Sequence, residues 1–194
     1  MRRIAMLLIV LPLIGSAQNR AVEIGMTRGH VLKMTGAPNG YFADGIRTKA
    51  FPRVTVGYVT EIYDRRVQGR KYELRIGYQP DESKSRLNPP LVVSELRFVS
   101  DKLMPASQLL TASIEAGRIC ARGCEILSRG DRGLLLRSNG KEKFFIEVSA
   151  MTQFGTGEEP AVRSLDDTAG EITISTIPPF SFEKLTKLGD WPRN

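Results

Sequence analysis

A strict alternation of apolar and polar residues at 71–79 constrains the fold of this chain more than any other feature of its sequence. The two sets are Tyr72, Leu74, Ile76 and Tyr78 on one side, and Lys71, Glu73, Arg75 and Gln79 on the other. Because successive side chains of a β-strand point to opposite faces of a sheet, the pattern predicts a strand with one buried face and one polar face. Such a strand needs neighbouring strands, and a second layer has to cover its apolar side.

Two further strand-like runs flank this one. Residues 54–64 are rich in Val, Thr and Tyr, which fit a pleated surface, and residues 91–99 again alternate apolar with charged side chains. A short polar connection at 65–70 and a longer loop at 80–90 join the three runs. The sequence therefore predicts an antiparallel three-stranded meander.

Signals for both ends of a helix precede the strands. Thr27 is a good N-cap because its hydroxyl can accept a hydrogen bond from an otherwise unpaired backbone N–H. Met26 and Val31 have the spacing of a hydrophobic staple. Gly36 can adopt the left-handed conformation that ends a helix, and Pro38 prevents its continuation. We expect a short helix between Thr27 and Gly36 that lies on the sheet.

A Gly-Met-Thr-x-x-x-Val helix that ends in Gly-x-Pro and precedes a three-stranded meander resembles the SmpA/OmlA lipoproteins, over about residues 22–100. The resemblance implies the fold of the β-lactamase-inhibitor-like periplasmic modules. It also implies the role of a small accessory subunit of the outer-membrane β-barrel assembly machinery, which binds and does not catalyse. By the same resemblance, the contact region is the first helix and the loop after it: Thr27, His30, Pro38, Asn39, Gly40 and Tyr41.

The second half of the chain again shows a helix followed by strands. The expected elements are a helix or helix-turn-helix at 105–125, strands at 133–137, 142–148 and 171–177, an exposed loop at 150–170 and a short final helix at 181–189. Asn139-Gly140 is the strongest hairpin signal because both residues tolerate positive φ.

We therefore predict an α+β fold, in which short helices pack on an antiparallel sheet of three or four strands. Because the order of helix and then strands occurs twice, the sequence allows two arrangements. One is two such modules in tandem, at 18–104 and 105–194. The other is a single sheet extended by extra strands. No residue-level self-similarity distinguishes them.

Residues 1–17 have the pattern of a cleavable signal peptide. Two arginines precede an apolar run at 4–14, and small residues at 15–17 suit signal peptidase. The apolar run of 11 residues is shorter than the roughly 20 that cross a bilayer as a helix. No cysteine near the cleavage site can receive a lipid. We expect a periplasmic or secreted protein without a transmembrane span.

Cys120 and Cys124 are the only cysteines of the chain. In an exported protein an internal disulfide is the leading interpretation, and a reactive dithiol is the alternative. In a regular helix their Cα atoms would be about 6 Å apart, near the upper end for a disulfide. We therefore expect Gly123 to turn the chain between them.

The sequence lacks the usual constellations of an enzyme. His30 is the only histidine, which removes most hydrolytic mechanisms that need a base near neutral pH beside a nucleophile. A zinc site is also disfavoured, because one histidine and one cysteine pair are too few. We predict no catalytic residue, no metal and no cofactor.

A basic cluster lies at the connection between the first two predicted strands: Arg65, Arg66, Arg70, Lys71 and Arg75. It could make a peripheral contact with anionic lipid headgroups or peptidoglycan. Alternatively, it is a solvated edge that discourages unwanted strand pairing. No aromatic platform accompanies it, so we expect no nucleic-acid partner.

Together, these features predict an exported cell-envelope protein that acts by protein–protein binding. The resemblance suggests the β-barrel assembly machinery as its partner and a part in outer-membrane assembly or integrity. The alternative is a soluble inhibitor of an envelope or extracellular hydrolase.

Overall fold

The computed structural model describes residues 21–43, 46–49, 59–85, 87, 89–121, 123–129, 133–139, 143–152 and 161–177. The predicted signal peptide at 1–17 and the predicted final helix at 181–189 lie outside these residues, as does Gly140 of the predicted Asn-Gly turn.

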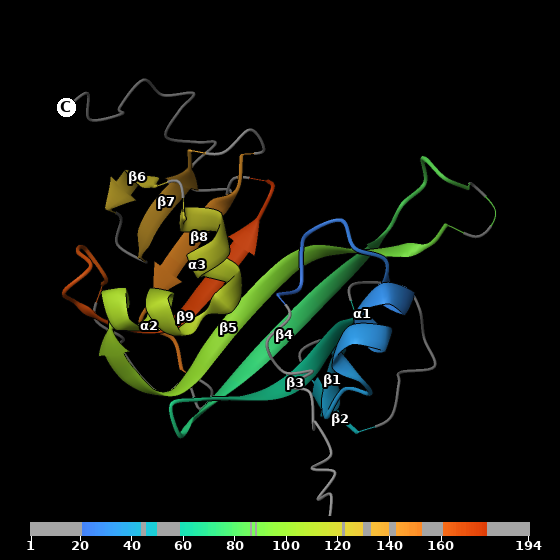
Figure 1. The fold of residues 1–194 in the computed structure, drawn as a ribbon, viewed down its shortest axis with the longest axis horizontal. Helices are drawn as coiled ribbons and strands as arrows, with labels where there is room; N and C mark the ends of the chain where they lie inside the picture. The colour runs from blue at the N-terminus through green and yellow to red at the C-terminus, as the bar shows by residue number, and fades with distance from the viewer. Residues whose placement is uncertain are drawn as a thin grey trace, which may run out of the picture.

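Nine antiparallel strands of the described residues form one sheet (Figure 1). In sheet order they are β2 (Ile46–Thr48), β1 (Gly40–Ala43), β3 (Thr60–Val67), β4 (Arg70–Pro80), β5 (Leu91–Pro105), β9 (Thr168–Ser175), β8 (Phe145–Ser149), β7 (Leu134–Ser138) and β6 (Cys124–Arg129). The long strand β5 runs through both halves of the sheet and pairs with β4 on one side and β9 on the other.

The prediction of a three- or four-stranded sheet, in one module or in two tandem modules, is wrong. The chain does form two meanders, β3–β4–β5 and β6–β7–β8–β9, but their last strands pair with each other from Glu95 opposite Ser175 to Val99 opposite Glu171. In two separate sheets, β5 and β9 would each be an edge strand with unpaired backbone N–H and C=O groups. Their pairing satisfies these groups. The chain therefore has the second predicted arrangement, one sheet extended by extra strands.

Three short helices complete the described fold: α1 (Arg28–Thr35), α2 (Ala106–Ala112) and α3 (Ile114–Cys120). α1 lies against β3 and β5, and α2 lies against β5 and β9 with α3 next to it (Figure 1). The predicted boundaries of α1 are confirmed. The Thr27 hydroxyl accepts a hydrogen bond from the His30 N–H, and Gly36 ends the helix with φ 79°.

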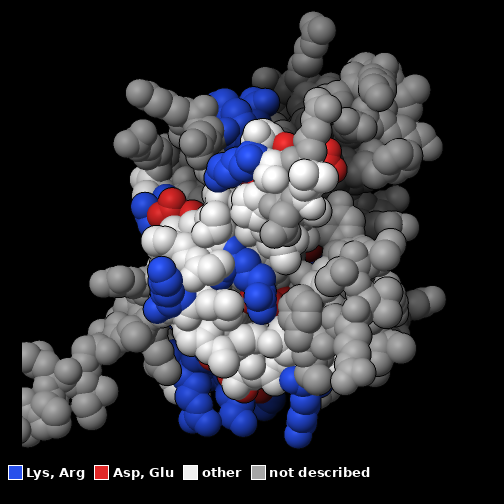
Figure 2. Space-filling model, turned by 90° about the vertical axis from the view of Figure 1, so that its right-hand side faces the viewer, with Lys and Arg blue, Asp and Glu red and all other residues white. Residues whose placement is uncertain are grey.

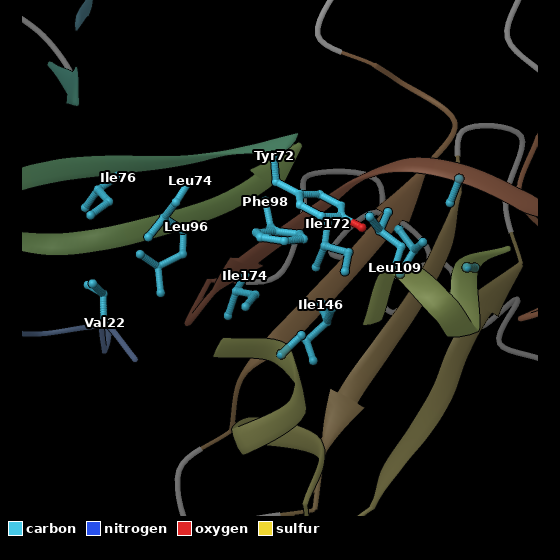
Figure 3. Packing of buried hydrophobic residues seen from close by; sticks show 14 of the residues in the cluster. Val22, Tyr72, Leu74, Ile76, Leu96, Phe98, Leu109, Ile146, Ile172 and Ile174 are labelled. Carbon is cyan, nitrogen blue, oxygen red and sulfur yellow. The ribbon is translucent and has the colours of Figure 1, made fainter. Parts of the chain in front are cut away.

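One hydrophobic core lies between the sheet and the helices (Figure 3). Alternate residues of the central strands supply it: Leu74 and Ile76 of β4, Leu96 and Phe98 of β5, Ile172 and Ile174 of β9, and Ile146 of β8. Leu109 of α2 packs against them from the helix layer. Each fully buried aliphatic side chain contributes about 1.5–3 kcal/mol relative to an exposed one. The alternation read at 71–79 therefore sets which face of the sheet the helices cover.

The predicted disulfide is present. Cys120 and Cys124 are bonded with their Cα atoms 5.3 Å apart, and Gly123 turns the chain between them with φ 87°. The turn ends α3 and starts β6, a strand that the sequence did not predict because it follows directly on the helical pattern. The short strands β1 and β2 were also missed.

Among the described residues, no helix combines the length and the apolar character that crossing a membrane requires.

We expect Gly170→Ala to destabilise the protein, because a Cβ at this position of β9 would lie 2.2 Å from the carbonyl oxygen of Met151. Overpacking of this kind costs about 1–3 kcal/mol. Gly29→Ala is the matched control: it lies in α1 with nothing near its Cβ position, so it should be neutral or stabilise by up to about 1 kcal/mol. Chemical denaturation measures both free energies of unfolding. Equal effects of the two substitutions would contradict the packing of 151–152 against β9.

Candidate functional site

The face of the sheet opposite the core carries a band of charged side chains, here named the charged face. Its members are Arg47, Glu73, Arg75, Glu95, Arg97, Glu125, Arg137, Glu147 and Glu171. The strand register places them on one side: Arg75 lies opposite Arg97, Arg97 opposite Thr173, and Thr173 opposite Glu147. The band therefore crosses the sheet from β2 to β6, perpendicular to the strands.

The first group of the charged face centres on Glu73. Its Oε1 accepts from Arg47 Nη1 at 2.8 Å and its Oε2 from Arg75 Nη2 at 2.8 Å. The Arg75 guanidinium also lies 4.9 Å above the ring centroid of Phe42. The Glu73 side chain is buried, while Arg47 is half exposed. A buried carboxylate thus holds two guanidinium groups in fixed positions.

The second group centres on Arg97. Its Nε donates to Glu95 Oε1 at 2.6 Å, and its Nη1 lies 3.8 Å from Glu171 Oε1. Thr173 Oγ1 donates to the same Glu171 oxygen at 3.0 Å. Partial burial works to lower the pKa of Arg97, but the hydrogen bond and the charges of the surrounding glutamates raise it. Arg97 therefore stays charged and oriented.

Arg137 of β7 and Glu125 of β6 form a third ion pair at the far end of the band. Ion pairs thus order the arginines of the band, and several of their guanidinium groups remain partly open to solvent. Such a surface can meet complementary charges of another protein with little further loss of side-chain freedom.

A buried carboxylate network lies on the other face of the sheet, beneath α1. Glu61 of β3 is fully buried, and its Oε1 accepts from Arg28 Nη2 at 2.7 Å and Nε at 2.8 Å. Its Oε2 accepts from Tyr63 Oη at 2.8 Å and Tyr78 Oη at 2.9 Å. Burial and the Glu61 charge raise the pKa of both tyrosines. The tyrosines therefore stay protonated as donors, and the network fastens α1 to the sheet.

Glu115 is a second buried carboxylate near the helices. It borders a cavity of about 30 Å³, lined by Arg65, Arg66, Val67, Phe98, Ala112, Ile114 and Glu115. That volume holds about one water molecule. Burial raises the pKa of Glu115 and outweighs the charge of Arg65 and the hydrogen bond from the Val22 N–H. The cavity is too small for an organic substrate, and we assign Glu115 to the anchoring of the N-terminal segment.

The residues predicted as a binding region fall into two groups rather than one. Thr27 and exposed His30 lie at the N-terminal end of α1, whereas Pro38–Tyr41 follow its C-terminal end. An eight-residue helix is about 12 Å long. Two residues of the second group support the fold. Asn39 Oδ1 accepts a hydrogen bond from the Asp64 N–H at 2.9 Å. Gly40 lies so close to β2 that a Cβ there would be 3.2 Å from the Thr48 carbonyl oxygen.

The predicted basic cluster is also divided. Arg65 lies opposite Tyr72, while Arg66 lies opposite Lys71 on the other face of the hairpin. Arg75 belongs to the Glu73 group described above. Arg66, Arg70 and Lys71 remain exposed around the two-residue turn between β3 and β4, whose residues both have positive φ. On the side of the molecule shown in Figure 2, Lys and Arg side chains occur in several separate groups, some of them next to acidic side chains.

The charged face itself was not predicted as a site. The sequence showed Glu95 and Arg97 on the polar side of a strand, but Glu171 joins them only because β9 pairs with β5. The alternation of Glu171 and Thr173 with buried isoleucines was the available signal. Within the described residues, no three His, Cys, Asp or Glu side chains gather as metal ligands.

Comparison with protein-family models finds no match, and comparisons with curated proteins and with solved structures find none either. The resemblance of residues 22–100 to the SmpA/OmlA proteins stays a prediction.

We expect Arg28→Ala to lower the free energy of unfolding by about 2 kcal/mol or more, because Glu61 would keep a buried charge with one oxygen stripped of its donors. Arg118→Ala is the matched control. It breaks an ion pair with Glu23 whose two side chains are 61% and 45% exposed, so its effect should stay below about 1 kcal/mol. Urea denaturation checks both, and equal losses would contradict the role of the buried network.

Glu115→Gln should stabilise the protein increasingly as pH rises. Burial raises the pKa of Glu115 in the folded state, so the folded protein holds this proton to a higher pH than the unfolded chain, in which the pKa is about 4.3. Wild-type stability is therefore lost as pH rises through the raised folded-state pKa, and the variant avoids this loss. Thermal unfolding of wild type and variant, from the pKa of the unfolded chain to above that of the folded state, measures the difference in their stability. The surface substitution Glu82→Gln is the control for the loss of one charge. A difference independent of pH would contradict the assignment.

Proposed function

We propose that this chain is an exported, non-enzymatic protein of the cell envelope that binds another protein through the charged face of its sheet. The observation that carries the proposal is the ordered band of ion pairs. Its guanidinium groups are held by carboxylates, yet Arg47, Arg97 and Arg137 keep 50%, 43% and 37% of their side chains exposed.

Order in the free protein favours specific binding. A flexible arginine loses about 0.5–1.5 kcal/mol of conformational freedom when a partner fixes it. In the charged face much of this loss already accompanies folding, because Glu73 and Glu95 hold their arginines. Charges of both signs at fixed positions also reject a partner whose own charges are misaligned, since like charges would then meet. The arrangement suits recognition of one protein surface.

The proposed location rests on the signal-peptide pattern at 1–17. The proposed class of partner, a component of the β-barrel assembly machinery, rests on the resemblance of residues 22–100 to the SmpA/OmlA proteins. That resemblance also suggests a contact through α1 and the loop after it, which lies on the helix-covered side of the sheet.

A photo-cross-linking residue placed at three positions tests the proposal in intact cells of the source. Ser149 is half exposed on the charged face, His30 is exposed on α1, and Ser107 is exposed on α2 as the control. We expect a discrete cross-linked product from Ser149 and none from Ser107. Mass spectrometry then identifies the partner as an assembly component or as a hydrolase.

The three positions separate the alternatives. A product from His30 with none from Ser149 would favour the α1 contact and reject the charged face. No product at either position would reject protein binding at both surfaces. A hydrolase captured at Ser149 would favour the inhibitor role over the accessory role.

A further inference from the structure

One carboxylate of the charged face has an unused acceptor. Glu171 of β9 is 5% exposed. Both of its contacts in the second group, the Thr173 hydroxyl at 3.0 Å and Arg97 Nη1 at 3.8 Å, are to Oε1. Oε2 is buried and has no hydrogen-bond partner in the described part of the structure. A buried acceptor without a donor is rare in folded proteins, because it loses its hydration without compensation.

The other buried glutamates of the strands differ from Glu171. Glu61 accepts from Arg28 on one oxygen and from two tyrosines on the other, and Glu73 accepts from one arginine on each oxygen. This sheet thus satisfies both oxygens of a carboxylate where the carboxylate serves the fold. The exception at Glu171 indicates that its second donor comes from another molecule.

The surroundings of Glu171 favour a cation as this donor. The carboxylates of Glu95, Glu147 and Glu171 all act on the guanidinium of Arg97. The nearest other cation along the register, Arg75, is already held by Glu73. A charged donor also binds a carboxylate about twice as strongly as a neutral one.

The register shows the side from which such a donor can approach. Glu171 lies between Val99 of β5, which is buried, and Ser149 of β8, which is half exposed. Arg97 borders the carboxylate and is 43% exposed.

We infer that Glu171, flanked by Glu95 and Glu147, receives the ammonium or guanidinium group of a lysine or arginine side chain on the partner protein. This inference rests on the proposed function and names the chemistry that the charged face recognises at its centre. The incoming cation supplies the missing donor to Oε2, while Arg97 remains hydrogen-bonded to Glu95.

Glu171→Gln tests the inference in the cross-linking experiment with the probe at Ser149. The glutamine keeps the size of the side chain and the oxygen that accepts from Thr173, but it loses the charge. We expect the cross-linked product to fall at least about tenfold, the loss typical of a hydrogen bond to a charged group, while the melting temperature stays equal or rises. Glu82→Gln, in an exposed loop, removes one charge elsewhere and should leave the product unchanged.

Two outcomes of that experiment would overturn the inference. A Glu171→Gln protein that cross-links as well as wild type would show that the partner binds without this carboxylate, and the proposed function would stand. A product lost together with a clear fall in melting temperature would assign Glu171 to the fold.

A second measurement needs no partner and therefore separates a failure of the inference from a failure of the proposed function. Purified wild-type protein labelled with ¹³C is titrated with N-acetyl-lysine methylamide, and the side-chain carboxyl resonance of Glu171 is followed by NMR. The Glu171→Gln spectrum assigns that resonance. We expect a saturable shift, and no shift with the uncharged N-acetyl-glutamine methylamide. An unmoved resonance, or equal shifts with both probes, would overturn the inference.

Discussion

The pairing of β5 with β9 is the interaction on which the rest of the structure depends. It joins strands that are far apart in the chain, from Glu95 opposite Ser175 to Val99 opposite Glu171. Without it, each meander would end in an open edge and would have only part of the core residues of Figure 3 to bury. Closing so long a loop is entropically costly, so the pairing needs the isoleucines of β9 to pack against Leu96 and Phe98 of β5 as it forms.

The same pairing separates the two kinds of buried carboxylate. Glu61 lies on the helix-covered face, where burial is complete and only full hydrogen bonding makes a charge tolerable. Glu171 lies on the charged face and is buried, but only one of its two carboxylate oxygens accepts a hydrogen bond. Both are acids at alternating strand positions, so sequence does not distinguish them. The difference lies in their donors. Glu61 accepts from Arg28 of α1 and from two tyrosines, whereas Glu171 accepts from Thr173 and has Arg97 at 3.8 Å.

Local patterns predicted local structure well and long-range structure poorly. The alternation at 71–79 identified β4, and the cap signals identified α1, because both depend on residues within one or two turns of each other. The Cys120–Cys124 bond was also predictable, since its loop is short. The order of the nine strands was not predictable. Whether Val99 of β5 pairs with Glu171 of β9 depends on all the other strand edges that could pair with β5 instead. The charged face was missed for the same reason: apart from Glu73 with Arg75 and Glu95 with Arg97, its ion pairs join different strands.

The position of α1 bears on how two contact surfaces would work together. The α1 region suggested by the family resemblance lies on the helix-covered side of the sheet, and the charged face lies on the opposite side. A single flat partner cannot touch both, because a sheet and its covering helices separate them by roughly the 10 Å spacing of packed layers. A chain that used both surfaces would hold two partners at once, one on each side. An inhibitor needs only one occupied surface, whereas an accessory subunit gains from two. Binding at both surfaces would therefore distinguish the accessory role from the inhibitor role.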